Sequence, residues 1–359
     1  RSEQIDPARP GAYHIISRCV RRAFLCGDEA EHRREWLETG LRTHAQAFAV
    51  DVLTLAVMST HLHVVVRTDP ERTRTWSPRE VVERWGIIFP KVDPETGESG
   101  PWEPAEVDRC ANDPVWVETR RERLASVSWF MRILKQRIAR RANREDGVTG
   151  HFWEGRFQSV PLLDDAAVVS CMAYVDLNPI RAKMATTPEA SNHTGVQRRI
   201  DARQVYRKAC AILEQAEQER AATGATTIDP KLIARAEQAR TDGPEHDLWI
   251  APALSATDNQ VSLDDYLQLV DATGRILKTG KRGQIPDHLK PILERLQIDV
   301  DTWLDVMLSH GKFLGTAVGA LVNLIAEAGR RGIRWIADKT RIHKDRRKRA
   351  PPKLEPATG

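Results

Sequence analysis

The chain has 359 residues, of which 41% are hydrophobic, enough for a sizeable core and, by the usual size of domains, for two domains. This composition excludes a chain that is intrinsically disordered throughout. The formal net charge is only +4, with 54 Lys and Arg against 50 Asp and Glu, so a polyanionic partner would have to be met by local basic surfaces.

The cysteines and apolar segments favour a cytoplasmic protein. The five cysteines are an odd number without a CxxC pair, a pattern that fits neither a disulfide framework nor a thiolate zinc site. No apolar run approaches the roughly 20 residues that a membrane span needs, and the first residues lack the apolar region of a signal peptide. We therefore expect a reducing compartment and no membrane partner.

The first part of the chain predicts a strand, a helix and a hairpin. Residues 12–20 are β-branched and partly alternating, and residues 28–49 carry apolar side chains at helical spacing. Two more strands are predicted at 51–58 and 62–67. Only Ser59, Thr60 and His61 separate them, so they should form a tight hairpin.

The middle of the chain predicts three helices and one more strand. Ser77 followed by proline is typical of a helix start, whereas residues 90–114 are rich in Pro, Gly and acids and favour a long loop or insertion. Helical periodicity resumes over 119–144, and a strand candidate follows at 151–162. Asp164 or Asp165 then caps a helix that stops near Asn178. This order predicts an α+β fold with an antiparallel sheet and packed helices, similar to the βαββαβ ferredoxin-like plan.

The last part of the chain predicts a separate helical region. Residues 186–204 are polar and turn-prone, which favours a linker between a domain of residues 1–185 and a mainly α-helical domain of residues 205–340. Residues 310–328 fit either a helix-turn-helix that reads duplex DNA or an ordinary helix hairpin of small residues. Residues 341–359 form a basic tail that we expect to be disordered and to bind nucleic acid nonspecifically. We expect no catalysis from residues 205–359.

The segment MSTHLHVVVR, residues 58–67, is the most informative in the chain. In a strand, residues i and i+2 point to the same face, so His61 and His63 can present two imidazoles to one metal ion. A lone His-x-His pair more often consists of polar side chains without a specific role or of histidines that form hydrogen bonds in the core. The pair needs a second motif to gain specificity.

The second motif is YVDLNPIR, residues 174–181, at the end of a predicted helix. Tyr174 and Asn178 lie four residues apart and share a helix face. A phenol can attack phosphorus when a metal or a base lowers the cost of deprotonation, and an Asn carbonyl oxygen is a hard ligand suited to Mg²⁺ or Mn²⁺. The alternative for Tyr174 is a buried ring with a wet hydroxyl.

Together these segments resemble the HUH single-tyrosine transposases, and most of all the REP-associated tyrosine transposases of bacteria. The matching stretches are GAYHIISR at 11–18, MSTHLHVVV at 58–66, HFWEGRFQS at 151–159 and YVDLNPIRA at 174–182. They occur in the family's order over residues of about 11–185, and the combination is far more specific than either motif alone.

The resemblance implies an RRM-like HUH nuclease core. It also implies that His61, His63 and Asn178 bind Mg²⁺ or Mn²⁺, and that Tyr174 attacks a DNA phosphate to form a 5′-phosphotyrosine link. Members of the family bind hairpin-forming single-stranded DNA, including repetitive palindromic elements. The implied activity is therefore cleavage and rejoining of single strands by a monomer or a homodimer, with Tyr174 acting in its own chain or across the dimer.

Basic and aromatic residues predict where DNA would lie. The helix around 121–144 is rich in Arg, and residues 151–158 alternate along a probable strand, so both could contact a single strand. The candidate DNA contacts are Arg132, Lys135, Arg140, His151, Trp153, Arg156 and Arg181. Two alternative functions stay open: a catalytically inactive, domesticated relative that grips DNA or RNA hairpins as a regulator, and a replication-initiator or relaxase-like HUH nuclease.

Overall fold

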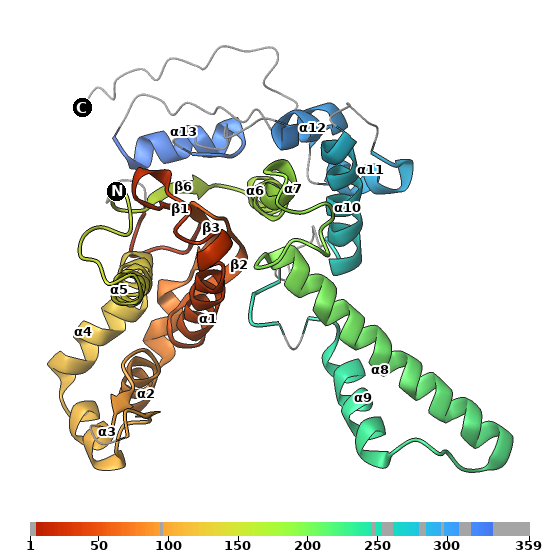
Figure 1. The fold of residues 1–359 in the computed structure, drawn as a ribbon, viewed down its shortest axis with the longest axis horizontal. Helices are drawn as coiled ribbons and strands as arrows, with labels where there is room; N and C mark the ends of the chain where they lie inside the picture. Colours follow the sequence, from red (N-terminus) through yellow and green to blue (C-terminus); the bar gives the residue numbers. More distant parts are fainter. Residues whose placement is uncertain are drawn as a thin grey trace.

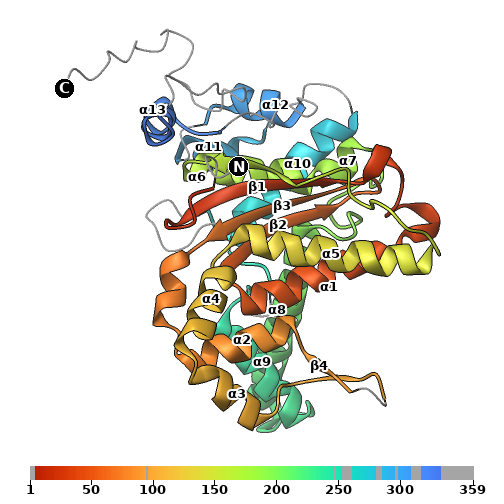
Figure 2. The same cartoon turned by 90° about the vertical axis from the view of Figure 1, so that its left-hand side faces the viewer.

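Four antiparallel strands form the centre of the molecule, between two layers of helices (Figures 1 and 2). The structure is a computed structural model, and it describes residues 5–93, 96–245, 248–252, 261–279, 285–295, 298–308 and 317–332. The mixed helix and sheet content agrees with the predicted α+β class. Among the helices in these ranges, none combines the length and the apolar composition needed to cross a bilayer.

The strands follow the order β2-β3-β1-β6 across the sheet. Their bounds are Gly11–Arg18 for β1, Val50–Val57 for β2, His61–Thr68 for β3 and Gln158–Leu162 for β6. β2 and β3 form the predicted hairpin, closed where the Met58 N–H donates to the His61 carbonyl at 2.8 Å. In the pairing of β1 with β3, Ile16 lies opposite His63 and Arg18 lies opposite His61.

One face of the sheet is covered by helices from the first half of the chain (Figure 2). They are α1 (His32–Ala47), α2 (Pro78–Ile88), α4 (Pro114–Leu124) and α5 (Val127–Glu145). Helix α3 (Pro104–Ala111) packs on α2 and α4, away from the strands. Alternate residues of a strand point to opposite faces, so Leu62, Val64 and Val66 enter this core together with Leu41 and Phe130.

Short 3-10 helices cover Val20–Arg22, Asp28–Ala30, Pro70–Thr75 and Asp287–Leu289.

The other face is covered by α6 (Asp165–Asp176) and α7 (Asn178–Arg181), with helices from the C-terminal part of the chain packed beyond them. These helices are α10 (Leu263–Thr279), α11 (Lys290–Arg295), α12 (Val300–Leu308) and α13 (Leu321–Arg330). Val65 of the sheet, Tyr174 of α6, Val270 of α10 and Trp303 of α12 belong to one hydrophobic cluster. Helix α6 is thus held from both sides.

A helical hairpin projects from this body (Figure 1). It consists of α8 (Gly195–Thr223) and α9 (Pro230–Asp242), joined by a small apolar cluster that includes Leu213 and Ile233. The first turns of α8 lie within the segment expected to be a linker. Arg199 anchors them, because its fully buried guanidinium donates to the Leu53 carbonyl at 2.8 Å.

Three predicted elements need correction. The loop expected over 90–114 contains a small hairpin of β4 (Lys91–Val92) and β5 (Ser99–Gly100), followed by α3, which starts with Pro104. The helix expected over 119–144 is two helices, because Ser126 caps a new one by accepting from the Trp129 N–H at 3.4 Å. The strand expected from His151 begins only at Gln158.

Two features predicted near the C-terminus lie partly or wholly outside the described residues. Residues 310–316 of the expected helix-turn-helix and the whole basic tail at 341–359 are not among them, while α13 covers the second part of the expected motif.

Candidate functional site

Three imidazoles and a phenol lie together on the face of the sheet that α6 covers. His61 and His63 are neighbours on one face of β3, with ring centroids 4.7 Å apart and ring planes nearly perpendicular, at 82°. His14 of β1 is on the same face, because Ile16, two residues along, pairs with His63. The His14 Nε2 atom is 2.9 Å from the His63 Nδ1 atom, a buried hydrogen bond between two rings.

The Nδ1 atoms of both predicted ligands have hydrogen-bond partners. The His61 Nδ1 atom lies 2.8 Å from the Thr60 hydroxyl, and the His63 Nδ1 atom lies against His14. This arrangement leaves the Nε2 atom of each ring for another partner, and a bond at Nδ1 is what usually orients a metal-binding histidine. Sequence reasoning missed His14, although it falls within the stretch GAYHIISR that carries the family resemblance.

Burial keeps the three imidazoles neutral. It lowers the pKa of His14 to about 3 and the pKa of His61 to about 4, and it holds the pKa of His63 well below the ordinary value. The positive charge of Arg181 lowers the pKa of each ring further. A neutral imidazole is the form that can donate a lone pair to a cation.

Tyr174 is held between His14 and Arg181. Its side chain is 4% exposed, and its ring meets the ring of His14 edge-on with centroids 6.4 Å apart. The Arg181 guanidinium, from α7, lies over the Tyr174 ring at 3.7 Å from the centroid. The phenol of α6 is therefore linked through His14 to the histidine pair on β3.

Asn178 also lies in this cluster, but it faces Arg181. Its side-chain carbonyl accepts a hydrogen bond from Arg181, and within the described residues its buried amide nitrogen has no partner. Nowhere in the described ranges do three or more His, Cys, Asp or Glu side chains gather as a metal site. To bind a cation together with His61 and His63, the Asn178 oxygen would have to exchange Arg181 for the cation. The Arg181 charge would repel a bound cation, so an anionic ligand would have to accompany it.

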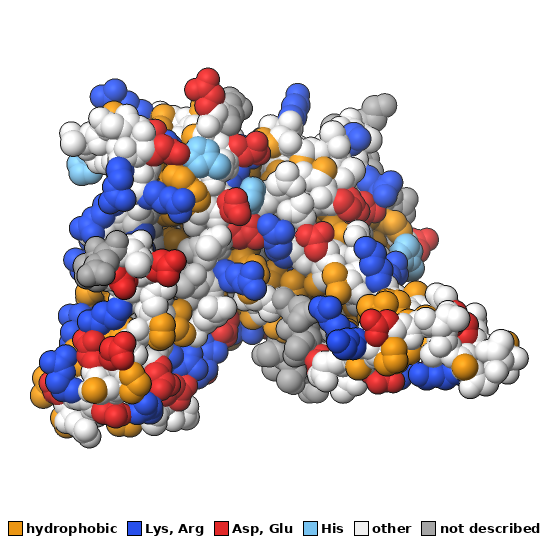
Figure 3. All heavy atoms as spheres, turned by 60° about the horizontal axis from the view of Figure 1, so that its bottom comes forward, with side chains coloured by type: hydrophobic (Ala, Val, Ile, Leu, Met, Phe, Trp, Pro, Cys, Tyr) orange, Lys and Arg blue, Asp and Glu red, His pale blue; other side chains and the backbone are white. Residues whose placement is uncertain are grey.

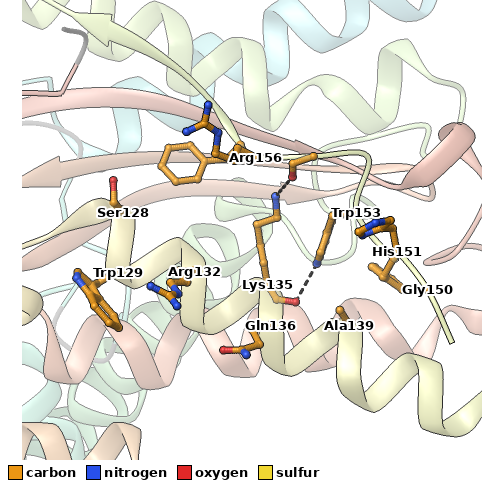
Figure 4. Close-up of a pocket in the computed structure, with 13 residues that line it drawn as sticks. Ser128, Trp129, Arg132, Lys135, Gln136, Ala139, Gly150, His151, Trp153 and Arg156 are labelled. Atoms are coloured by element: carbon orange, nitrogen blue, oxygen red, sulfur yellow. Dashed lines mark hydrogen bonds between the residues drawn. The ribbon is translucent and has the colours of Figure 1, made fainter. Parts of the chain in front are cut away.

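A second feature is a cavity of about 690 Å³ between α5 and residues 150–157 (Figure 4). Most of the predicted DNA contacts line it, namely Arg132, Lys135, His151, Trp153 and Arg156. Two of them build its wall: the Lys135 ammonium donates to the Gly155 carbonyl at 2.6 Å, and the Trp153 indole N–H donates to the Lys135 carbonyl at 2.9 Å.

The other two predicted contacts lie elsewhere. Arg140 is exposed on α5 but does not line the cavity, and Arg181 belongs to the histidine cluster. Over the face drawn in Figure 3, Lys and Arg side chains are spread among Asp and Glu side chains. Because the formal net charge is only +4, attraction for a polyanion has to come from local sites such as the cavity rim.

The cavity wall is bonded to the strand end beside the histidines. The Glu154 N–H donates to the Arg18 carbonyl at 2.9 Å, and Arg18 lies opposite His61 in the sheet. Cys19, the residue after β1, forms a bridge with Trp153. The cavity wall, on the α5 side of the sheet, is therefore joined through the backbone to the end of β1 that lies opposite His61.

Comparison with known proteins does not identify this site. Scans against family models, curated proteins and solved structures each found no match to the chain. The function is therefore inferred from two features of the chain: a phenol within a histidine cluster on the α6 side of the sheet, and a basic and aromatic cavity on the α5 side.

Proposed function

We propose that this protein is a metal-dependent DNA strand transferase of the HUH single-tyrosine type. It cleaves and rejoins single-stranded DNA that contains hairpins, through a 5′-phosphotyrosine intermediate on Tyr174. His61, His63 and Asn178 are the proposed ligands of Mg²⁺ or Mn²⁺. The observation that carries the proposal is the packing of Tyr174 against His14, whose other neighbour is the predicted metal ligand His63.

The arrangement of the strands supports the same proposal. β1, α1, β2, β3, α5 and β6 occur in the order βαββαβ, with α2, β4, β5, α3 and α4 inserted between β3 and α5. The sheet order β2-β3-β1-β6 places β1 and β3 at its centre. This is the order expected of a ferredoxin-like or RRM-like core, with α6 added on the free face. In such a core the His-x-His strand is central and rigid, which suits a site that must hold two ligands in place.

In the proposed reaction the Tyr174 oxygen attacks phosphorus in line and forms a P–O bond while the bond to the 3′ oxygen breaks. The phenol gives up a proton and the leaving 3′ oxygen gains one, so no nucleotide energy source is needed. A bound divalent cation would polarise the phosphate and offset charge on its oxygens. The Arg181 guanidinium, which lies over the Tyr174 ring, would pair with the same phosphate. His14 would orient His63 through its hydrogen bond to the His63 Nδ1 atom.

The test is a denaturation-resistant adduct with labelled single-stranded hairpin DNA in Mg²⁺ or Mn²⁺. We expect the wild-type protein and a Tyr206→Phe control on α8 to form the adduct, and Tyr174→Phe to form none. The proposal would be refuted if the Tyr174→Phe variant still formed the adduct, or if the wild-type protein bound hairpins but formed no adduct. The second result would favour the alternative of an inactive hairpin-binding regulator.

A further inference from the structure

Arg181 contacts side chains that the proposed reaction needs. Its Nη2 atom donates to the Asn178 side-chain oxygen, and its guanidinium lies over the Tyr174 ring at 3.7 Å from the centroid. Beyond the effect of burial, its positive charge lowers the pKa of His61 and His63. One guanidinium therefore contacts the proposed nucleophile and one proposed metal ligand, and its charge reaches the other two ligands.

Arg181 and a divalent cation would compete for the Asn178 oxygen. This oxygen would complete the ligand set of His61 and His63, but it accepts a hydrogen bond from Arg181. A cation bound to it would lie next to a second positive charge, and water screens such repulsion only weakly at a buried site. Unless an anion compensates, Arg181 therefore weakens the binding of a cation.

A phosphate would end this competition. In the part of the chain that the structure describes, the Nε and Nη1 atoms of Arg181 are buried and have no hydrogen-bond partner. A phosphate offers several acceptor oxygens and a negative charge, so it stabilises a guanidinium more than one neutral amide oxygen does. When Arg181 turns to a phosphate, the Asn178 oxygen becomes accessible to a cation, and the phosphate charge offsets the remaining repulsion.

We propose that Arg181 makes metal binding depend on DNA: it holds the Asn178 oxygen until a DNA phosphate draws the guanidinium away, and the cation then binds. The choice of metal and of DNA rests on the proposed function. Coupling of this kind is reciprocal, so DNA must raise the affinity for the cation by the factor by which the cation raises the affinity for DNA.

A purely structural role of Arg181 predicts the opposite result. If the guanidinium served only to hold α7 against the Tyr174 ring, its removal would loosen Asn178 and weaken metal binding. If it competes with the cation, its removal strengthens metal binding in the absence of DNA. The sign of the change therefore separates the two roles.

The first measurement is Mn²⁺ binding without DNA, by titration calorimetry, on variants whose folding is checked by circular dichroism. We expect Arg181→Met, which removes the charge, to bind Mn²⁺ about tenfold more tightly than the wild type. Arg181→Lys keeps a charge and should gain no more than about twofold. Arg181→Gln is a second uncharged variant, for which the same gain is expected if Arg181→Met does not fold.

Arg18 provides a matched control. Its charge also lowers the pKa of His61 and His63, but Asn178 accepts its hydrogen bond from Arg181. Removal of the Arg18 charge reduces repulsion of a cation without releasing the Asn178 oxygen. We expect Arg18→Met to change Mn²⁺ affinity less than about threefold.

The second measurement is the coupling with DNA. Mn²⁺ is titrated into Tyr174→Phe protein with and without a saturating single-stranded DNA hairpin that carries unpaired flanks. We expect the hairpin to raise Mn²⁺ affinity about tenfold or more. Adding Arg181→Met should reduce this factor to about threefold or less, because no guanidinium is left to exchange, whereas adding Arg18→Met should leave it unchanged.

Three results would overturn the inference. They are Mn²⁺ binding by the uncharged variants that is no tighter than that of the wild type, a gain in Arg181→Lys equal to that in Arg181→Met, and a hairpin that changes Mn²⁺ affinity less than about twofold. Failure of the proposed function is different: tighter Mn²⁺ binding by Arg181→Met without any wild-type DNA adduct keeps the exchange and removes the transferase. A wild-type adduct with unchanged Mn²⁺ affinity in Arg181→Met removes the exchange and keeps the transferase.

Discussion

Replacing Asp176 with alanine tests how the helix that carries Tyr174 is held. Asp176 is the last residue of α6 and is fully buried. Its carboxyl group accepts hydrogen bonds from the Thr54 hydroxyl, the Tyr266 hydroxyl and the Val196 N–H, the last at 3.1 Å. Burial raises the pKa of this carboxyl, and the nearby Arg199 guanidinium opposes that shift. One side chain therefore joins the sheet, α8 and α10.

The expected loss of stability is large. Alanine would leave three buried donors without an acceptor, and each such group costs about 1–3 kcal/mol. Allowing for partial relaxation, we expect the free energy of unfolding to fall by about 4 kcal/mol or more, against a typical total of about 5–15 kcal/mol. Asp176→Asn keeps one acceptor oxygen and should lose clearly less.

The assay is urea unfolding followed by tryptophan fluorescence. Asp165→Ala, in the first turn of the same helix, is the control, and there only a favourable interaction with the helix dipole is lost, about 1 kcal/mol or less. If Asp176→Ala unfolds within about 1 kcal/mol of the wild type, the hydrogen bonds around Asp176 do not hold the helix and the reasoning fails.

Three more outcomes can be measured. His14→Ala should weaken Mn²⁺ binding about 10- to 100-fold in titration calorimetry, because the His63 Nδ1 atom loses its hydrogen-bond partner. The control His151→Ala should leave Mn²⁺ binding unchanged. Equal effects of the two substitutions would contradict the role of His14 in orienting His63. Burial lowers the pKa of His44 to about 3, so below pH 6.5 protons bind the unfolded chain first. His44 alone then makes stability fall by about 1.4 kcal/mol per pH unit, and its contribution is kept in full above pH 6.5. Because His14, His61 and His63 add to this fall, His44→Leu should reduce the slope in urea melts at pH 7.5, 6 and 5 by about 1.4 kcal/mol per pH unit, and an unchanged slope would count against it. A fragment of residues 1–185 should fail to melt cooperatively, because α10 and α12 leave the cluster around Tyr174; a cooperative melt would instead support the predicted boundary.

Elements with local signals were predictable from the sequence. The hairpin of β2 and β3, the cap at Ser77 and the cap at Asp164 each depend on residues close together in the chain, and all are present. The shared face of His61 and His63 follows from the alternation of a strand. The α+β class could also be predicted, because the patterns typical of strands and helices are local in the chain.

Features that depend on distant contacts were not predictable. The role of His14 requires the register in which Ile16 meets His63, which no local pattern encodes. The sequence predicts a strand from His151, but the two hydrogen bonds between Lys135 and this segment hold it as a cavity wall, and β6 begins only at Gln158. The packing of α10 and α12 on α6 is likewise a tertiary contact between segments far apart in sequence.

The position of α6 between the sheet and these helices has a consequence for genetics. Trp303 and Tyr266 are fully buried in the layer that covers α6, in the same cluster as Tyr174, and neither is proposed to touch DNA. In a screen for loss of activity, substitutions in α10 and α12 should therefore score like substitutions in the histidine cluster. If the proposed function holds, such a map would mark the C-terminal helices as part of the inherited unit that selection preserves, because their side chains keep Tyr174 in place.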